Sequence, residues 1–248
     1  MAGHSKWANI QHRKSAVDQK RAKRWTKILR EVTVSARLGG GDPDANPRLR
    51  SAIQDARTDN VPNDTIDRAI KKGTGELEGA SYEEVTYEGY GPGGVAVIIE
   101  VQTDNRNRTV ADLRHIFSRH EGSLGETNSV AWMFERRGFF EVERGTMSEE
   151  EVMELALEVG VEDIDTEGEN YELYSAYEDY AAVREELEGR DVKLVTKQLA
   201  MVPSNNVEVE GGAAQTAIRL LEALEDHDDV QHVWANLSVD EEALAAAE

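Results

Sequence analysis

The order of helix-like and strand-like segments constrains the fold of this chain more than any other feature. Up to about residue 75, apolar residues recur every three or four positions, which is the spacing of one face of an α-helix. From residue 82 the pattern alternates, as in YEEVTYEGY, and an apolar strand-like run, GVAVIIEV, follows the turn sequence GPGG. The chain therefore predicts an N-terminal helical domain followed by α/β structure.

Three helices are predicted before residue 75. The first carries an apolar stripe and ends at three consecutive glycines, residues 39–41. Asn46 is the expected N-cap of the second, with Pro47 in its first turn. The third follows Pro62 and ends at Gly73, and GTGELEGAS forms the linker to the next domain. The stripe of the first helix consists of Ala22, Trp25, Leu29, Val32 and Ala36.

The remaining segments predict two α/β units. After the hairpin, a helix over residues 110–117 and a strand over residues 129–134 give ββαβ, which lacks a second helix and a last strand. The segments GFFEVER, residues 148–159, IDTEG, YELYS, residues 177–187 and VKLVTKQLAMV then give β-α-β-β-α-β, the ferredoxin-like order. A helix near residues 217–224 and the strand VQHVWANL complete the interrupted unit.

The predicted fold class is therefore α+β, with an N-terminal helical domain and two ferredoxin-like α/β domains, one inserted in the other. The predicted boundaries are 1–80 for the basic helical domain, 81–136 with 204–248 for the discontinuous α/β domain, and 137–203 for the inserted domain.

Charge is strongly segregated along the chain. The net charge is −21, yet residues 1–38 contain ten Lys and Arg against only Asp18 and Glu31, a balance of 10 − 2 = +8. After Ala80, 12 basic residues face 39 acidic ones, a balance of −27. Such asymmetry is typical of a nucleic-acid or membrane contact. At about 100° per residue, the cations of the first predicted helix lie opposite its apolar stripe.

The basic N-terminal region is the main candidate for binding nucleic acid, because phosphate neutralisation requires several cations on one surface. Trp7 offers a ring for stacking on a base, whereas Trp25 is expected in the core. The alternative interpretation is that the basic face docks on the acidic part of the same chain. The candidate nucleic-acid-binding residues are Lys6, Trp7, His12, Arg13, Lys14, Lys20, Lys23, Arg24, Lys27, Arg30, Arg106 and Arg108.

Arg106 and Arg108 form a second cationic set at the start of a predicted helix. There they would favour a bound phosphate, because backbone N–H groups and the helix dipole also attract anions at that end. The alternative is that they offset the nearby carboxylates Glu100, Asp104 and Asp112.

Other patterns give no support for catalysis or metal binding. The chain has no cysteine, which excludes disulfides, a thiolate nucleophile and Cys-ligated zinc. The glycines of EGYGPGG join two strands and lack the Lys-Ser/Thr of a phosphate loop, so they predict a turn. The acidic stretch EDHDD, residues 225–229, connects a helix to a strand and is expected to be solvated. We predict no catalytic residue, metal, cofactor or small-molecule substrate.

The sequence also predicts a cytoplasmic protein without a membrane partner. Charges stand where a signal peptide requires an apolar run, and the longest apolar stretch, residues 95–99, is too short to cross a bilayer.

Five stretches together resemble the YebC family across nearly the whole chain: AGHSKWANIQHRK, EGYGPGGVAVIIEVQTDNRNRTVADLRHIF, LGETNSVAWMF, MVPSN and LLEALEDHDDVQHVWANL. The resemblance implies a three-domain, non-enzymatic regulator of gene expression. Members of the family are described either as DNA-binding transcriptional regulators or as ribosome-associated translation factors that relieve stalls at runs of proline. DNA or ribosomal RNA, and the ribosome, are the implied partners. The alternative function is a protein-interaction scaffold whose basic helix docks on its own acidic domains.

Overall fold

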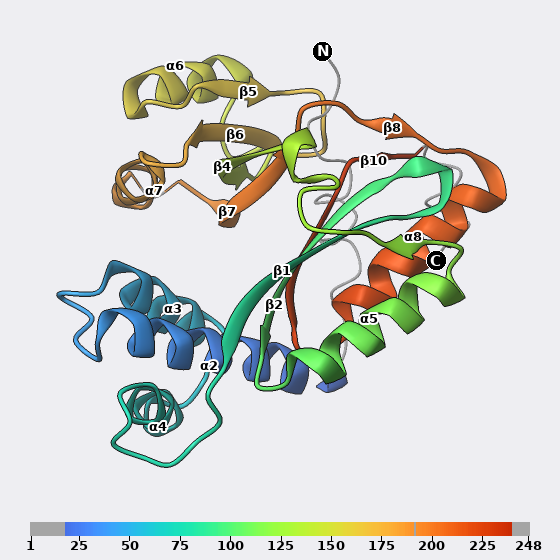
Figure 1. The fold of residues 1–248 in the computed structure, drawn as a ribbon. Helices are drawn as coiled ribbons and strands as arrows, with labels where there is room; N and C mark the ends of the chain where they lie inside the picture. The colour runs from blue at the N-terminus through green and yellow to red at the C-terminus, as the bar shows by residue number, and fades with distance from the viewer. Residues whose placement is uncertain (1–17, 191, 240–248) are drawn as a thin grey trace.

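The computed structural model describes residues 18–190 and 192–239 (Figure 1). Side chains are described from residue 22 onward. Helices α2 (Asp18–Gly39), α3 (Pro47–Thr58) and α4 (Asn63–Gly73) form the N-terminal unit. Their apolar faces enclose a core that includes Val32, Leu49 and Ile66. The three predicted helices are therefore confirmed, with the predicted N-cap at Asn46 and the predicted stops at Gly39 and Gly73.

Local contacts explain how these helices meet. The Asn46 side chain accepts a hydrogen bond from the Leu49 backbone N–H and so caps α3. Its amide nitrogen donates to the carbonyls of Ser35 and Gly40, which ties the start of α3 to the end of α2. At Gly73, a Cβ atom would lie 2.3 Å from the backbone oxygen of Thr33, so only glycine lets α4 approach α2 this closely.

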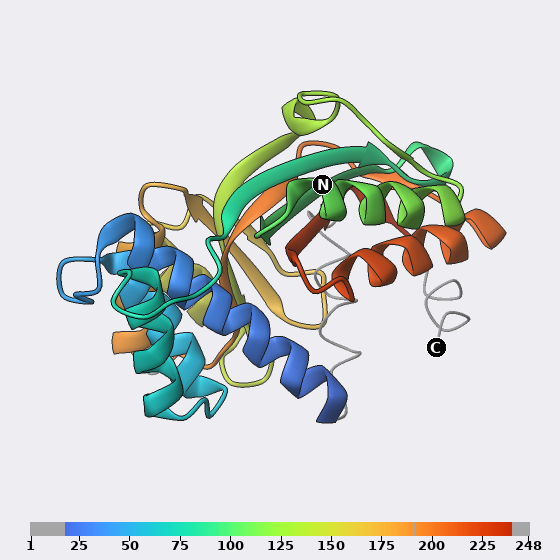
Figure 2. The same cartoon turned by 60° about the horizontal axis from the view of Figure 1, so that its bottom comes forward.

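The first sheet is antiparallel and has the order β3-β1-β2-β9. Helices α5 and α8 cover one of its faces, as Figure 2 shows, and the shared core includes Val97, Leu113 and Ile218. The elements are β1 (Glu83–Tyr90), β2 (Ala96–Thr103), α5 (Arg106–Arg119), β3 (Ser123–Leu124), α8 (Gly211–Glu225) and β9 (Val230–Ala235). The last two elements join this sheet from the far end of the chain, as the sequence predicted.

A 3-10 turn, η1 (Pro92–Gly94), joins β1 to β2. Gly93 and Gly94 have φ values of 72° and 80°, a region that favours glycine. The glycine-rich stretch is therefore a hairpin turn, as predicted.

The second sheet has the order β5-β6-β4-β7, which is the ferredoxin-like arrangement of a β-α-β-β-α-β unit. Its elements are β4 (Phe134–Val142), α6 (Glu149–Val159), β5 (Asp163–Asp165), β6 (Tyr171–Ala176), α7 (Tyr180–Gly189) and β7 (Leu194–Pro203). The α+β class and the insertion are confirmed. In the first sheet, however, the hairpin strands β1 and β2 are both central, so its connections differ from those of the ferredoxin-like sheet.

Two smaller features complete the fold. The short strands β8 (Val207–Glu208) and β10 (Leu237–Ser238) pair in parallel. The remaining faces of the two large sheets meet in a cluster that includes Ile98, Tyr174 and Trp234. No helix within residues 18–190 and 192–239 is long and apolar enough to cross a membrane.

The predicted strand over residues 129–134 is wrong. This segment forms a loop and a 3-10 turn, η2 (Ala131–Met133), and the third strand of the first sheet is instead the short β3. The physical reason is the Glu88 carboxylate, which accepts hydrogen bonds from the backbone N–H groups of Asn128, Val130 and Ala131. Those N–H groups are thus unavailable for strand pairing.

Candidate nucleic-acid interface

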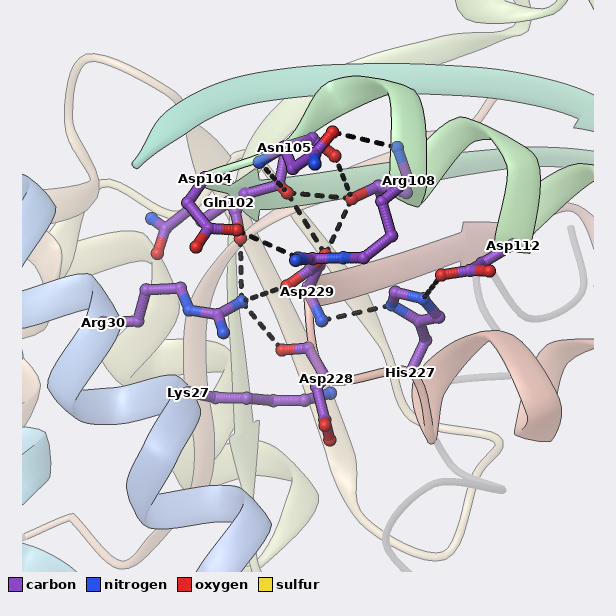
Figure 3. Close-up of polar contacts among 12 residues, drawn as sticks. Lys27, Arg30, Gln102, Asp104, Asn105, Arg108, Asp112, His227, Asp228 and Asp229 are labelled. Atoms are coloured by element: carbon purple, nitrogen blue, oxygen red, sulfur yellow. Dashed lines mark hydrogen bonds and ion pairs between the residues drawn. The ribbon is translucent and has the colours of Figure 1, made fainter. Parts of the chain in front are cut away.

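The cationic face of α2 lies against the turn of residues 225–229, between α8 and β9 (Figure 3). Lys23 Nζ donates to the backbone oxygen of Asp226 at 3.0 Å, and Lys27 Nζ donates to that of Glu225 at 2.7 Å. These carbonyls stand at the C-terminal end of α8, where the helix dipole concentrates negative charge. Burial at this contact lowers the pKa of Lys27. Two candidate cations thus cap a helix of the same chain.

Arg30 lies deeper in the contact between α2 and the 225–229 turn, which we call the junction. Its Nη1 atom donates to the backbone oxygens of Gln102 at 2.7 Å and Asp228 at 2.8 Å, and to Asp229 Oδ1 at 3.1 Å. Only 9% of the Arg30 side chain is exposed. Because its charge is already compensated and largely buried, Arg30 connects α2 to the first α/β sheet and is poorly placed to meet a phosphate.

Asp229 is the centre of this junction. Its Oδ2 atom accepts hydrogen bonds from Arg108 Nη2 at 2.7 Å, Thr109 Oγ1 at 2.7 Å and Thr103 Oγ1 at 3.2 Å. Its own backbone N–H donates to His227 Nδ1 at 3.1 Å. Burial alone would raise the pKa of Asp229, but the hydrogen bonds from Arg108 and Thr109 hold that pKa below its usual value.

The expectation that the 225–229 turn is solvated is therefore wrong for Asp229, whose side chain is only 5% exposed. The turn is drawn inward because Arg30 and Arg108 approach it from two different helices. Thr103 and Thr109, which sequence reasoning missed, complete the contact. The one available signal was the helical spacing, which puts Thr109 on the inner face of α5.

The two arginines of the second cationic set, Arg106 and Arg108, lie in different surroundings. Arg108 contacts both Asp104, at 3.0 Å, and Asp229, so it offsets carboxylates as the alternative interpretation proposed. Arg106 lies 3.8 Å from Glu83, and both of these side chains are about 60% exposed. Arg106 thus stays open to solvent while Arg108 belongs to the junction.

The other candidates lie further along the N-terminal region. Arg24 is 65% exposed and its Nε atom lies 2.6 Å from Asp59 Oδ2. Trp25 donates to the backbone oxygen of Asp59 at 3.1 Å and packs on the helical core, as predicted. Lys20 belongs to α2, but its side chain lies outside the described ones. Five candidates precede the described residues: Lys6, Trp7, His12, Arg13 and Lys14.

A pocket of about 590 Å³ opens beside the junction, between α2, α5 and the 225–229 turn. Its walls carry three cations, Lys23, Arg30 and Arg108, but also five aspartates, namely Asp104, Asp112, Asp226, Asp228 and Asp229. The excess of carboxylates repels phosphate, so the pocket itself does not suit a nucleic-acid backbone. Among the residues that the structure describes, no group of three or more His, Asp or Glu side chains is arranged to hold a metal ion.

Comparison with known proteins identifies relatives over the full chain. A family model described as the TACO1/YebC protein N-terminal domain matches residues 5–76, and one described as the TACO1/YebC second and third domain matches residues 82–237. A protein of Natranaerobius thermophilus is 51% identical over 247 residues, covering 98% of this chain and 99% of that protein. A protein of Chlorobaculum tepidum is 51% identical over 249 residues, covering 100% of this chain and 99% of its own length. Both are named probable transcriptional regulatory proteins.

A solved structure agrees with the sequence matches. The crystal structure of a conserved hypothetical protein from Aquifex aeolicus superposes with a TM-score of 0.88 at 48% identity, covering 96% of this chain and 98% of that one. The resemblance noted in the sequence motifs is thereby confirmed, and the chain belongs to the TACO1/YebC family.

Proposed function

We propose that this protein is a non-enzymatic regulator of gene expression that binds nucleic acid through its basic N-terminal region. The observation that carries the proposal is the balance of +8 over residues 1–38 in a chain of net charge −21. The names of the relatives, probable transcriptional regulatory proteins, support a regulatory role. We place this role in the cytoplasm.

The contacts of α2 refine which cations meet phosphate in this proposal. Lys23, Lys27 and Arg30 are engaged by the 225–229 turn. We therefore assign the phosphate contacts mainly to cations that precede them, namely Lys6, Arg13, Lys14 and Lys20, with Arg24 and Arg106 at the edge. Trp7 and His12 supply stacking and hydrogen bonding. The acidic α/β part limits indiscriminate binding, because its carboxylates repel phosphate. Fields are screened over about 8 Å at physiological salt, so these carboxylates do not cancel the attraction of the basic region.

The proposal has two forms, a DNA-binding transcriptional regulator and a ribosome-associated translation factor that relieves stalls at runs of proline. Their nucleic-acid partners differ, so crosslinking in cells followed by sequencing of the bound nucleic acid separates them. The test variant is Arg13→Glu/Lys14→Glu/Lys20→Glu. A charge-matched control is Arg144→Glu/Arg190→Glu/Lys193→Glu, which reverses three exposed cations of the inserted sheet unit.

Each outcome has a clear meaning. Discrete ribosomal RNA positions that vanish in the test variant and persist in the control would establish the translational form. Promoter DNA with the same behaviour would establish the transcriptional form. Recovery of neither, or equal loss in both variants, would overturn the proposal.

The second candidate function, a protein-interaction scaffold, is favoured by the docked position of Lys23, Lys27 and Arg30. In that function the basic region serves internal docking alone. Lys27→Glu places a carboxylate beside Glu225 and Asp226, so it lowers the melting temperature under either function. The Arg13→Glu/Lys14→Glu/Lys20→Glu variant discriminates, because nucleic-acid binding predicts lost affinity with nearly unchanged melting, whereas the scaffold predicts no affinity to lose.

A further inference from the structure

An exposed tryptophan stands in the segment that links the two large sheets. The Trp132 side chain is 74% exposed, although it belongs to the 3-10 turn that directly precedes β4. Its indole Nε1 atom donates to the backbone oxygen of Ser129 at 3.1 Å. The polar atom of the ring thus has a partner within the loop, and the ring is presented to solvent.

Several hydrogen bonds hold the loop beneath Trp132. Glu88, which is only 5% exposed, accepts three backbone hydrogen bonds of 2.7 to 2.8 Å from residues 128–131. Tyr90 donates its hydroxyl hydrogen to the Ser129 backbone oxygen at 2.9 Å, and Val130 is fully buried. Because the support is already ordered, little conformational entropy is lost when a partner contacts the ring.

Two neighbouring segments at this turn contain no charged residue. The backbone N–H of Ser204 donates to the oxygen of Met133 at 2.8 Å, which brings residues 204–206 beside residues 127–133. Neither segment contains a Lys, Arg, Asp or Glu, although acidic residues outnumber basic ones 39 to 12 after Ala80. Exposed Asn128, Ser204 and Asn205 supply amide and hydroxyl groups instead. We call residues 127–133 and 204–206 the neutral patch.

The chemistry of the neutral patch suits a nucleobase. A single exposed ring is too little apolar surface for a stable protein interface, which buries about 800 Å² on each partner. One ring is enough to stack on one unpaired base, and amide groups beside it can hydrogen-bond to base edges. The absence of cations means that the patch supplies little phosphate affinity of its own.

We infer that the neutral patch binds one unpaired nucleobase, which stacks on Trp132. This inference rests on the proposed function for its main source of affinity. It adds a preference for single-stranded nucleic acid over a duplex, because a paired base cannot reach the ring.

The test measures the affinity of the full chain for a fluorescein-labelled single-stranded RNA of mixed sequence and for its duplex. Trp132→Ala is expected to weaken single-strand binding by roughly tenfold and to leave duplex binding unchanged. Trp132→Phe is expected to retain most of the affinity. The matched control is Leu157→Ala, which removes an 82% exposed apolar side chain from α6.

A second readout keeps the inference separate from the proposed function. RNA containing 4-thiouridine is crosslinked to the wild type, and the modified peptide is identified by mass spectrometry. A crosslink within residues 127–133 supports the inference, and its absence overturns it whatever the overall affinity. Loss of binding on reversal of Arg13 and Lys14, with no effect of Trp132→Ala, would sustain the proposed function and reject the base contact.

Discussion

Arg30 and Asp229 form an ion pair at 3.1 Å in which both side chains are more than nine-tenths buried. The pair joins the first described helix to the turn before β9, the last strand of the first sheet. Removal of one member of such a pair leaves an uncompensated buried charge. This contact therefore contributes to the attachment of the helical unit to the α/β structure.

The first prediction concerns Asp229→Asn, which keeps the shape of the side chain and removes its charge. The free energy of unfolding is expected to fall by about 3 kcal/mol, because Arg30 and Arg108 lose their shared anion. Thermal melting of the full chain measures this as a lower melting temperature. Asp226→Asn is the matched control, since its side chain is 74% exposed and lies 3.7 Å from Lys23. Equal effects of the two substitutions would contradict the buried role of Asp229.

The second prediction concerns acid. The pKa of Asp229 lies below its usual value because hydrogen bonds from Arg108 and Thr109 outweigh its burial. A carboxyl with a lowered pKa contributes stability above its unfolded pKa of about 3.9, and this stability is lost as the pH falls through the folded pKa. The difference in melting temperature between wild type and Asp229→Asn should therefore shrink as the pH is lowered below about 4. A difference that stays constant down to about pH 2 would show that the carboxylate charge is unimportant.

The third prediction concerns Glu88→Gln. The pKa of Glu88 is lowered because, against the effect of its burial, backbone hydrogen bonds from Val130 and Asn128 stabilise the anion. An amide turns N–H donors toward the loop, so at least one backbone donor loses its partner, at a loss of about 1 to 3 kcal/mol. Hydrogen exchange should accelerate at residues 128–131. The exposed Glu126→Gln serves as control, and unchanged exchange in Glu88→Gln would refute the capping role.

The fourth prediction concerns Gly73→Ala. The new methyl group would overlap the Thr33 backbone oxygen and contact Ala36 Cβ at 2.8 Å, which forces α4 away from α2. Such overpacking lowers stability by about 1 to 3 kcal/mol. Gly189→Ala is the control, because nothing lies within 4 Å of the position its Cβ would take. Comparable melting temperatures for the two variants would mean that the helices do not need a glycine at this contact.

Local signals predicted the elements whose structure is set locally. Asn46 and Gly73 mark helix ends because a cap and a helix stop depend on neighbouring residues. The hairpin of β1 and β2 follows from alternation and its glycine turn. The segment of residues 129–134 could not be predicted, because the Glu88 carboxylate that organises it lies some 40 residues away along the chain.

The candidate interface shows the same limit. The helical pattern placed Lys23, Lys27 and Arg30 on one face of α2, and the structure confirms that they point the same way. What that face meets depends on residues 225–229, nearly two hundred positions later. The periodicity of apolar residues reports only local structure and cannot indicate such a distant contact. The burial of Asp229 could therefore not be predicted from the sequence.

The late arrival of β9 shapes how the chain can fold during synthesis. Strand β2 ends at Thr103, but its partner β9 begins only at Val230. Until then the edge of β2 stays unpaired, and its apolar face lacks α8. The strands of the second sheet are all synthesised by Pro203, so that sheet can form before the first sheet receives β9. Long-range strand pairing of this kind is slow, and it leaves the backbone N–H and C=O groups of the β2 edge open to pairing with another chain. The nascent chain therefore passes through a stage that is prone to aggregation.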